Sequence, residues 1–185
     1  DSVTVSNKVD ARRIVVEALR NTSFGRSEIL VRINAPKTDL HTDDLRETSM
    51  AQPDGYVVPK VEEPDQIQTI SRMLDNVESR FGWPQGSIRL LPIIETAKGI
   101  LNIDAIAQSD ERLSALLLGA EDLVLDIGAK RSPNGSEIFH ARSIVVMTAA
   151  AYELQAIDTV FVDLDDDPAL KTECNLARQL GFDGK

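Results

Sequence analysis

Two carboxylates in this sequence end apolar runs and lie close to glycines. Glu95 ends one run and precedes Gly99, whereas Asp122 ends the next run and follows Gly119. Glycine lets backbone approach a ligand closely, and a carboxylate pair suits a hard cation such as Mg²⁺, which takes oxygen ligands and keeps several waters. This arrangement predicts a Mg²⁺ site at Glu95 and Asp122. The alternative is that the two acids cap the helices that follow them.

Other charged side chains also stand at the ends of apolar runs. They are Arg32, Lys60 and Asp163. In a parallel barrel the carboxyl ends of all strands open onto one face, and that face carries the active site. We therefore expect these side chains to face the same site as the carboxylate pair. Lys60 has two interpretations, a substrate contact or an ion pair with Glu62 or Glu95.

The remaining reactive side chains have structural interpretations. Cys174 falls on the apolar face of the last predicted helix, which favours packing in the core over a role as a nucleophile. His41 lies in a polar loop and His140 in a helical pattern. Two unpaired histidines do not make a metal site, so solvent or capping roles are favoured. The acidic run 163–168 predicts a helix entry, with Asp167 as its cap.

These residues depend on an alternation of strands and helices. Short apolar runs at 28–34, 55–60, 88–95, 114–122 and 156–163 predict strands. Apolar residues at three-and-four spacing predict helices at 67–77, 138–152 and 170–177. Parallel neighbours need a crossover, so this alternation predicts an α/β protein with a parallel sheet covered by helices.

Composition narrows the classes of partner. The 185 residues carry 20 Lys and Arg against 30 Asp and Glu, a formal net charge of −10. This balance predicts no nucleic-acid and no membrane partner, because both are anionic. A single cysteine cannot form an internal disulfide, which favours a reducing compartment. We expect the cytoplasm, or an organelle matrix if a targeting segment precedes the sequence.

Several motifs occur in the order found in one known family. They are "VRIN", "VVPKVE", "LLPIIETAKGILN", "GAEDL", "HARS", "QAIDTVFVD" and "LGFDGK". With them the chain resembles the citrate lyase beta-subunit-like branch of the HpcH/HpaI aldolase family, which includes malyl-CoA and citramalyl-CoA lyases. The resemblance implies a TIM (β/α)8 barrel. Residues 1–185 would form a single partial domain with about strands three to seven, without the N-terminal strand and the C-terminal region.

The resemblance also implies roles for individual residues. Glu95 and Asp122 match the family's two Mg²⁺ ligands, and Arg32 matches the arginine that contacts the reacting carbonyl and the enolate oxygen. Three backbone N–H groups are expected to hold the substrate carboxylate, those of Gly119, Ala120 and Glu121. In several members the acid/base group is an aspartate from a neighbouring subunit, and here it would lie beyond Lys185. The assembly implied is a homo-oligomer, a trimer or a hexamer.

The implied activity is a Mg²⁺-dependent carbon–carbon lyase. It would cleave or form a 3-hydroxyacyl-CoA, such as malyl-CoA or citramalyl-CoA, giving an acyl-CoA and a 2-oxo acid. The alternatives are a citrate lyase beta subunit acting on an acyl-carrier-bound citryl thioester, a CoA-independent pyruvate aldolase and a non-catalytic homologue. Lys8, Arg12 and Arg13 could meet coenzyme A phosphates, although an ordinary solvated helix face is the favoured interpretation.

Overall fold

The computed structural model describes residues 1–132 and 134–185, and its strands alternate with helices. The strands are β1 (Leu30–Arg32), β2 (Gly55–Val58), β3 (Arg89–Ile94), β4 (Ala115–Leu118) and β5 (Gln155–Ile157). The α-helices are α1 (Lys8–Asn21), α2 (Leu40–Thr48), α3 (Pro64–Phe81), α4 (Ala97–Leu101), α5 (Ile103–Ala107), α6 (Ala120–Asp126), α7 (Phe139–Ala151) and α8 (Asp167–Leu180). Short 3-10 helices are η1 (Val5–Asn7), η2 (Ser49–Ala51) and η3 (Ser136–Ile138).

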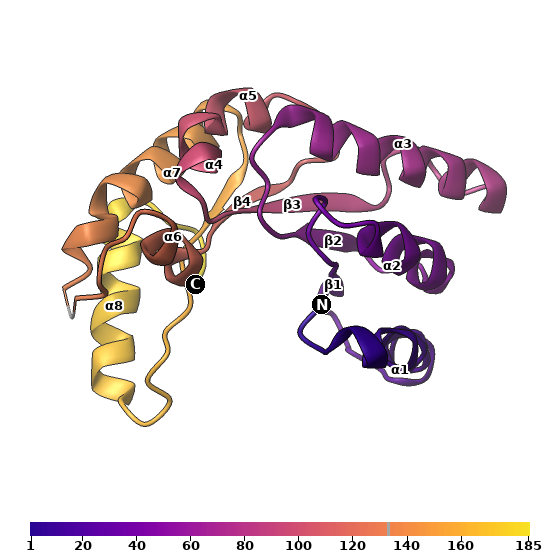
Figure 1. The fold of residues 1–185 in the computed structure, drawn as a ribbon, viewed down its shortest axis with the longest axis horizontal. Coiled ribbons are helices and arrows are strands. Elements are labelled where there is room, and N and C mark those ends of the chain that lie inside the picture. Colours follow the sequence, from indigo (N-terminus) through magenta and orange to yellow (C-terminus); the bar gives the residue numbers. More distant parts are fainter. Residues whose placement is uncertain (133) are drawn as a thin grey trace.

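All five strands are parallel and stand in chain order, β1-β2-β3-β4-β5. The elements follow one another round an open arc, with α1 and α8 at its two ends (Figure 1). Such an arc of parallel strands and covering helices is part of a TIM barrel, so the predicted fold class is confirmed. No helix in the described part of the chain is both long and apolar enough to cross a membrane.

The two faces of the sheet have different packing partners. Strand residues such as Tyr56, Leu90 and Leu116 join apolar residues of the helices in the main core. Their neighbours point the other way, because successive strand side chains alternate between faces. Val57, Leu91, Ile93 and Ala115 form a second, smaller cluster there, which is the inner face of the arc.

The register places the predicted site residues on this inner face. Arg32 pairs with Val57, and Val57 pairs with Leu91, so the three side chains point the same way. Glu95 lies two residues beyond Ile93 and keeps the same alternation. Strand geometry alone therefore brings a cation and a carboxylate to the carboxyl edge of the inner face.

Local capping explains where the longest helix begins and ends. Glu63 and Gln66 form a reciprocal capping box at the start of α3, and Pro64 occupies its first turn. At the other end Gly82 adopts a left-handed conformation, with φ of 69°. Between these caps Ile67, Ile70 and other apolar residues bury one stripe against the sheet.

Several expectations for the helices are wrong. His41 belongs to α2 rather than to a loop. The residue that caps α8 is Asp166, whose side chain accepts from the Ala169 N–H at 2.9 Å, because a cap must precede the helix that Asp167 begins. Cys174 is exposed rather than packed in the core, since Ala177 alone is buried among the residues of α8. His140 is exposed, as expected.

Candidate functional site

A hollow at the carboxyl edge of the sheet collects most of the predicted site residues. Its lining comprises Asp1, Ser2, Arg32, Asn34, Ala35, Pro59, Lys60, Ile93, Glu95 and Asp122. Its volume is about 340 Å³. Arg32, Lys60 and the two carboxylates thus line one hollow, although they come from four different strand ends. Asp163 does not line it, because β5 stops at Ile157 and the chain has left the sheet before reaching Asp163.

Glu95 follows directly on the last residue of β3 and is only 7% exposed. Its Oε1 accepts a hydrogen bond of 2.8 Å from the Lys60 N–H. Burial raises the pKa of the Glu95 carboxyl to about 7, and the negative charge of Asp122 adds to the rise, while the Lys60 N–H opposes it. A buried carboxylate beside a second one favours a bound cation.

Gly119 makes the approach of the two carboxylates feasible. A Cβ atom at Gly119 would lie 2.5 Å from both the Cβ and the Oε2 of Glu95. Any side chain at this position would therefore push Glu95 away. Gly119 immediately precedes α6, whose first turn carries Asp122. The absence of a side chain lets the start of α6 bring Asp122 close to Glu95.

Helix capping does not account for Glu95. The cap of α4 is Thr96, whose Oγ1 accepts from the Gly99 N–H at 3.0 Å. Glu95 precedes that cap and turns to the inner hollow instead. Asp122 lies in the first turn of α6, and its Oδ1 lies 3.2 Å from the Lys60 ammonium. The capping alternative is therefore wrong for Glu95, and Asp122 directs its carboxylate to a cation.

Arg32 borders the same hollow on its other side. Its Nε lies 2.8 Å from Asp1 Oδ2, and its terminal nitrogen donates to Ser2 Oγ at 2.6 Å. The guanidinium is about half exposed, at 49%. It is thus oriented by two residues that leave it in contact with solvent. This orientation suits a cation that meets an anionic ligand.

A buried network fixes the end of β1 that carries Arg32. Asp44 of α2 accepts from the backbone and side-chain nitrogens of Asn34, at 2.7 and 2.6 Å. Arg12 of α1 donates to the other oxygen of Asp44 at 2.7 Å, and Lys8 donates to Asn34 at 2.7 Å. Lys8 and Arg12 are each 7% exposed, so the expected solvated helix face is wrong for them. Arg13, in contrast, is solvent-exposed.

The expected carboxylate-binding turn is partly occupied by protein groups. Gly119 N–H donates to the Ile94 carbonyl at 3.0 Å, and Ala120 N–H donates to Thr159 Oγ1 at 3.1 Å. A substrate carboxylate at this turn has to compete with Thr159 for the Ala120 N–H. Sequence reasoning missed Thr159, and no motif connects it to this turn.

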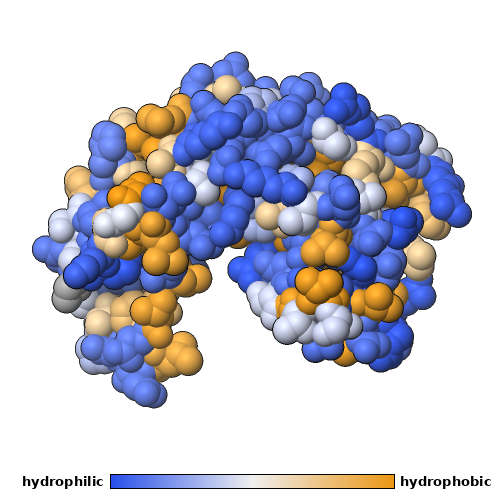
Figure 2. Space-filling model, viewed as in Figure 1, coloured by the Kyte–Doolittle hydropathy of each residue, from blue (hydrophilic) through white to orange (hydrophobic). Residues whose placement is uncertain are grey.

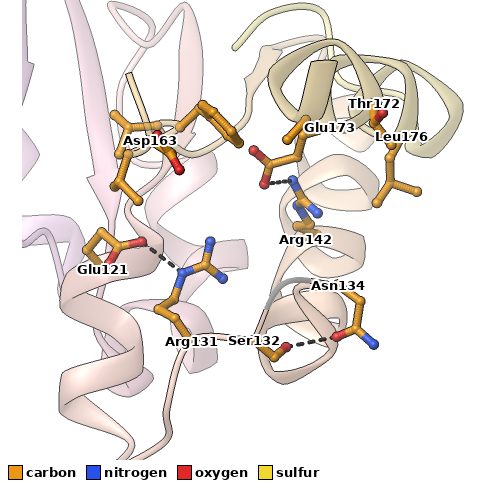
Figure 3. Close-up of a pocket in the computed structure, with 13 residues that line it drawn as sticks. Glu121, Arg131, Ser132, Asn134, Arg142, Asp163, Thr172, Glu173 and Leu176 are labelled. Carbon is orange, nitrogen blue, oxygen red and sulfur yellow. Dashed lines mark hydrogen bonds and ion pairs between the residues drawn. The ribbon is translucent and has the colours of Figure 1, made fainter. Parts of the chain in front are cut away.

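A larger cavity, about 740 Å³ in volume, is lined by a different set of residues (Figure 3). Asp163 lines it together with Glu121, the neighbour of Asp122. Its guanidinium groups are already paired. Arg131 lies 2.8 Å from Glu121, and Arg142 makes a buried pair with Asp158. Both arginines of this cavity are thus taken by carboxylates of the protein, which leaves them less able than Arg32 to bind an anionic ligand.

Other metal-binding arrangements are not apparent. Within residues 1–132 and 134–185, no group of three or more His, Cys, Asp and Glu side chains could hold a metal ion. A cation in the hollow would therefore have two protein carboxylates to hold it, Glu95 and Asp122, and would keep positions for water or ligand. That number of protein ligands is characteristic of Mg²⁺, which retains waters and binds substrate oxygens.

Comparisons with known proteins identify the family of this chain. A model of the family described as HpcH/HpaI aldolase/citrate lyase matches residues 1–185. The citrate lyase subunit beta of Leuconostoc mesenteroides subsp. cremoris is 36% identical over 185 residues, and the mitochondrial citramalyl-CoA lyase of Rattus norvegicus is 32% identical over 195 residues. In both cases all of this chain is covered, but only 61% and 57% of the relative.

A solved structure of similar fold also contains ligands. The citrate lyase beta subunit of M. tuberculosis, complexed with oxaloacetate and magnesium, is 27% identical, with a TM-score of 0.79. The match covers 100% of this chain and 76% of that one. The family model covers the whole chain, and the chain belongs to the HpcH/HpaI aldolase/citrate lyase family.

Proposed function

We propose that this chain carries the metal- and oxo-acid-binding part of a Mg²⁺-dependent carbon–carbon lyase. Its substrate would be a 3-hydroxyacyl-CoA such as malyl-CoA or citramalyl-CoA, cleaved into an acyl-CoA and a 2-oxo acid, or formed from them. The observation that carries the proposal is the gathering of Glu95, Asp122 and Arg32 around one hollow. Relatives named citrate lyase subunit beta and citramalyl-CoA lyase support it.

The side chains present fit a Mg²⁺ ion. Glu95 and Asp122 offer carboxylate oxygens, and burial first and the charge of Asp122 next raise the pKa of Glu95 to about 7. When bound there, the ion would polarise the carbonyl of a 2-oxo acid. Oxaloacetate and magnesium, the ligands of the M. tuberculosis complex, are of the same two chemical classes.

Arg32 supplies the second part of the chemistry. In the cleavage direction a base takes the proton of the 3-hydroxyl group, whose oxygen becomes the carbonyl of the 2-oxo acid. The electron pair of the breaking C–C bond moves into the thioester and leaves an enolate oxygen. A guanidinium keeps its charge at every working pH and donates several hydrogen bonds from a planar fork, so Arg32 stabilises that oxygen as charge develops. In the condensation direction the same contact stabilises the attacking enolate. We place the acid/base group outside residues 1–185.

A second candidate function differs in the carrier of the acyl group. The identity to citrate lyase subunit beta, at 36%, is higher than that to citramalyl-CoA lyase, at 32%. The similarity to citrate lyase subunit beta supports, as the alternative, a citryl thioester on an acyl-carrier partner. In either case we propose a homo-oligomeric lyase of the cytoplasm or of an organelle matrix. The two candidates share the metal pair and differ in what holds the thioester.

The test is an assay of the full-length protein against both kinds of thioester. Malyl-CoA, citramalyl-CoA and acyl-carrier-bound citrate are each supplied with Mg²⁺ or with EDTA. We expect turnover of a free CoA thioester that EDTA abolishes and that Asp122→Asn lowers by at least about a hundredfold. Asp163→Asn is the matched control, because Asp163 lines the larger cavity, and it should retain activity. Turnover that EDTA does not affect would contradict the proposal.

A further inference from the structure

Lys60 contacts both carboxylates of the site, with different groups. Its backbone N–H donates to Glu95 Oε1 at 2.8 Å, and its ammonium lies 3.2 Å from Asp122 Oδ1. It follows Pro59 immediately beyond β2, so it stands at the carboxyl edge beside the strand that carries Glu95. One residue thus links two acids that come from separate strands.

The backbone of Lys60 is unusual. Its φ is 54°, in the left-handed region that favours glycine. Glycine at this position would still provide the N–H group for Glu95. The lysine side chain adds an ammonium that reaches Asp122 and is 45% exposed. Lys60 therefore adopts a backbone conformation that glycine would adopt more easily, and it places a charged side chain at the site.

The charged groups of the hollow determine which anions the Lys60 ammonium can pair with. Arg32 is paired with Asp1, whereas the carboxylates of Glu95 and Asp122 have Lys60 beside them. A divalent cation that binds Asp122 competes with the ammonium for the same oxygens and repels it. Since the ammonium is nearly half exposed on a flexible stem, it can turn to another anion within the hollow.

Resting on the proposed function, we propose that Lys60 is an exchangeable counter-ion of the metal site. Its ammonium pairs with Asp122 while the metal is absent, and Mg²⁺ displaces it. The released ammonium then binds the carboxylate of the 2-oxo acid, beside Arg32. Lys60 is thus a substrate-binding residue whose availability depends on the metal. Mg²⁺ and the oxo acid consequently bind with positive coupling, and each increases the affinity for the other.

The test measures binding of two probes to the full-length protein by calorimetry. Mg²⁺ is titrated alone, and pyruvate is titrated with saturating Mg²⁺. Lys60→Met should tighten Mg²⁺ binding about fivefold, because a competing charge is lost. It should weaken pyruvate binding about tenfold, because a charge-assisted hydrogen bond is lost. A purely structural role for Lys60 would weaken both.

Three further variants separate charge, backbone and general effects. Lys60→Gly keeps the N–H and relieves the left-handed strain, so it should reproduce both shifts even if Lys60→Met folds poorly. Lys60→Arg keeps a cation, so its affinity for Mg²⁺ should lie nearer to that of wild type. Lys37→Met removes a lysine that pairs with Glu62 at 2.8 Å, outside the metal pair, and should change neither affinity.

The outcomes distinguish this inference from the proposed function. If Mg²⁺ binding to wild type is unaffected by Glu95→Gln and Asp122→Asn, the metal site itself is wrong and both proposals fall. If those variants abolish Mg²⁺ binding but Lys60→Met and Lys60→Gly do not shift the two affinities in opposite directions, the counter-ion role alone is overturned.

Discussion

Glu95 is held by neighbours that leave its carboxylate directed to the hollow. Thr96 takes the capping position of α4, and Gly119 lacks a side chain where one would collide with Glu95. The Lys60 N–H occupies one carboxylate oxygen. The residue is therefore buried, hydrogen-bonded and still available to a cation. Its raised pKa follows from that burial first and from Asp122 next.

This pKa predicts a pH dependence of metal binding. With the pKa of Glu95 raised to about 7, the carboxyl is largely protonated below that pH, and Mg²⁺ has to displace a proton. Mg²⁺ affinity should fall by about tenfold per pH unit as pH decreases below 7. Calorimetry between pH 6 and pH 8 measures the slope and the protons released. Glu95→Gln should bind weakly without this slope, and a wild-type affinity independent of pH would contradict the assignment.

The same shift predicts the sign of a stability change in the metal-free protein. The folded state holds the Glu95 proton more tightly than the unfolded state does. The resulting stabilisation is present below the ordinary carboxyl pKa of about 4.5 and is lost as pH rises through about 7. Between pH 5 and pH 8, Tm of wild type should fall relative to Tm of Glu95→Gln. A difference in Tm that grows in favour of wild type would contradict this sign.

Gly119→Ala tests the close approach directly. The new methyl group would lie 2.5 Å from Glu95, and strand pairing of Ile94 with Leu118 holds the residues that precede Glu95 and Gly119. We expect a loss of about 1–3 kcal/mol in the free energy of unfolding and weaker Mg²⁺ binding. Gly184→Ala is the control, because its Cβ would meet only the end of the Ile157 side chain, at 3.1 Å. Equal effects of the two substitutions would contradict the steric argument.

The elements before β2 act together through buried charge. Helices α1 and α2 contact each other, and Arg12, Asp44 and Asn34 connect them to the end of β1. Asp44 has a lowered pKa although burial opposes it, because the Asn34 N–H and Arg12 stabilise its charge. These helices therefore fix the end of β1, the strand that carries Arg32.

Adjacent arginines of α1 provide a matched test of this network. Arg12→Ala leaves Asp44 without its cation in a buried setting and should lower the free energy of unfolding by about 3 kcal/mol. Arg13→Ala removes an exposed arginine paired with Glu17 and should change it by less than about 1 kcal/mol. Urea unfolding of the two variants measures the difference. Similar losses for both would mean that the network does not stabilise the β1 end.

Hydrophobic pattern predicts some of these elements and misses others for a physical reason. The five strands are predictable because each overlaps a short apolar run, although β1 is largely exposed and β5 shares only two residues with the run 156–163. Helix α2 is not, since its buried face consists of His41, Asp44, Leu45 and Thr48, mostly polar residues. The buried positions of Lys8 and Arg12 likewise depend on partners distant in sequence.

Some features of the candidate site can likewise be predicted from the sequence, and others cannot. Sequence alone identifies Arg32, Glu95 and Asp122, because charged residues that follow parallel strands must meet at one edge of the sheet. The contact between Lys60 and Asp122 and that between Thr159 and Ala120 join different strands and follow no local pattern. They depend on tertiary structure. Thr96 is an exception, since a threonine before a short helix is a recognisable capping signal.

The molecule as a whole is an arc with two open ends. Hydrophobic surface appears around α8 at one end and near α1 at the other (Figure 2). Val160, Val162 and Leu164 are 62%, 66% and 90% exposed, at alternate positions of the segment before α8. Gly184 forms a parallel bridge with Ile157 on the open side of β5, where a further strand would pair. Several large apolar side chains exposed within one short segment are a sign of an interaction site.

We therefore predict that, in the full-length protein, other parts of the chain or another subunit cover the segment 160–164. The relatives exceed this chain in length, since it spans 61% of the citrate lyase subunit beta. Leu164→Asp in the full-length protein should place a charge in a covered apolar contact and lower the free energy of unfolding by at least about 2 kcal/mol. Leu101→Asp is the matched control, because Leu101 is 85% exposed, and it should cost less than about 0.5 kcal/mol. Denaturant unfolding gives both values, and sedimentation shows whether Leu164→Asp also dissociates subunits. If the two substitutions are equally mild, the end of the arc is a free surface, and the partial-barrel prediction fails at this edge.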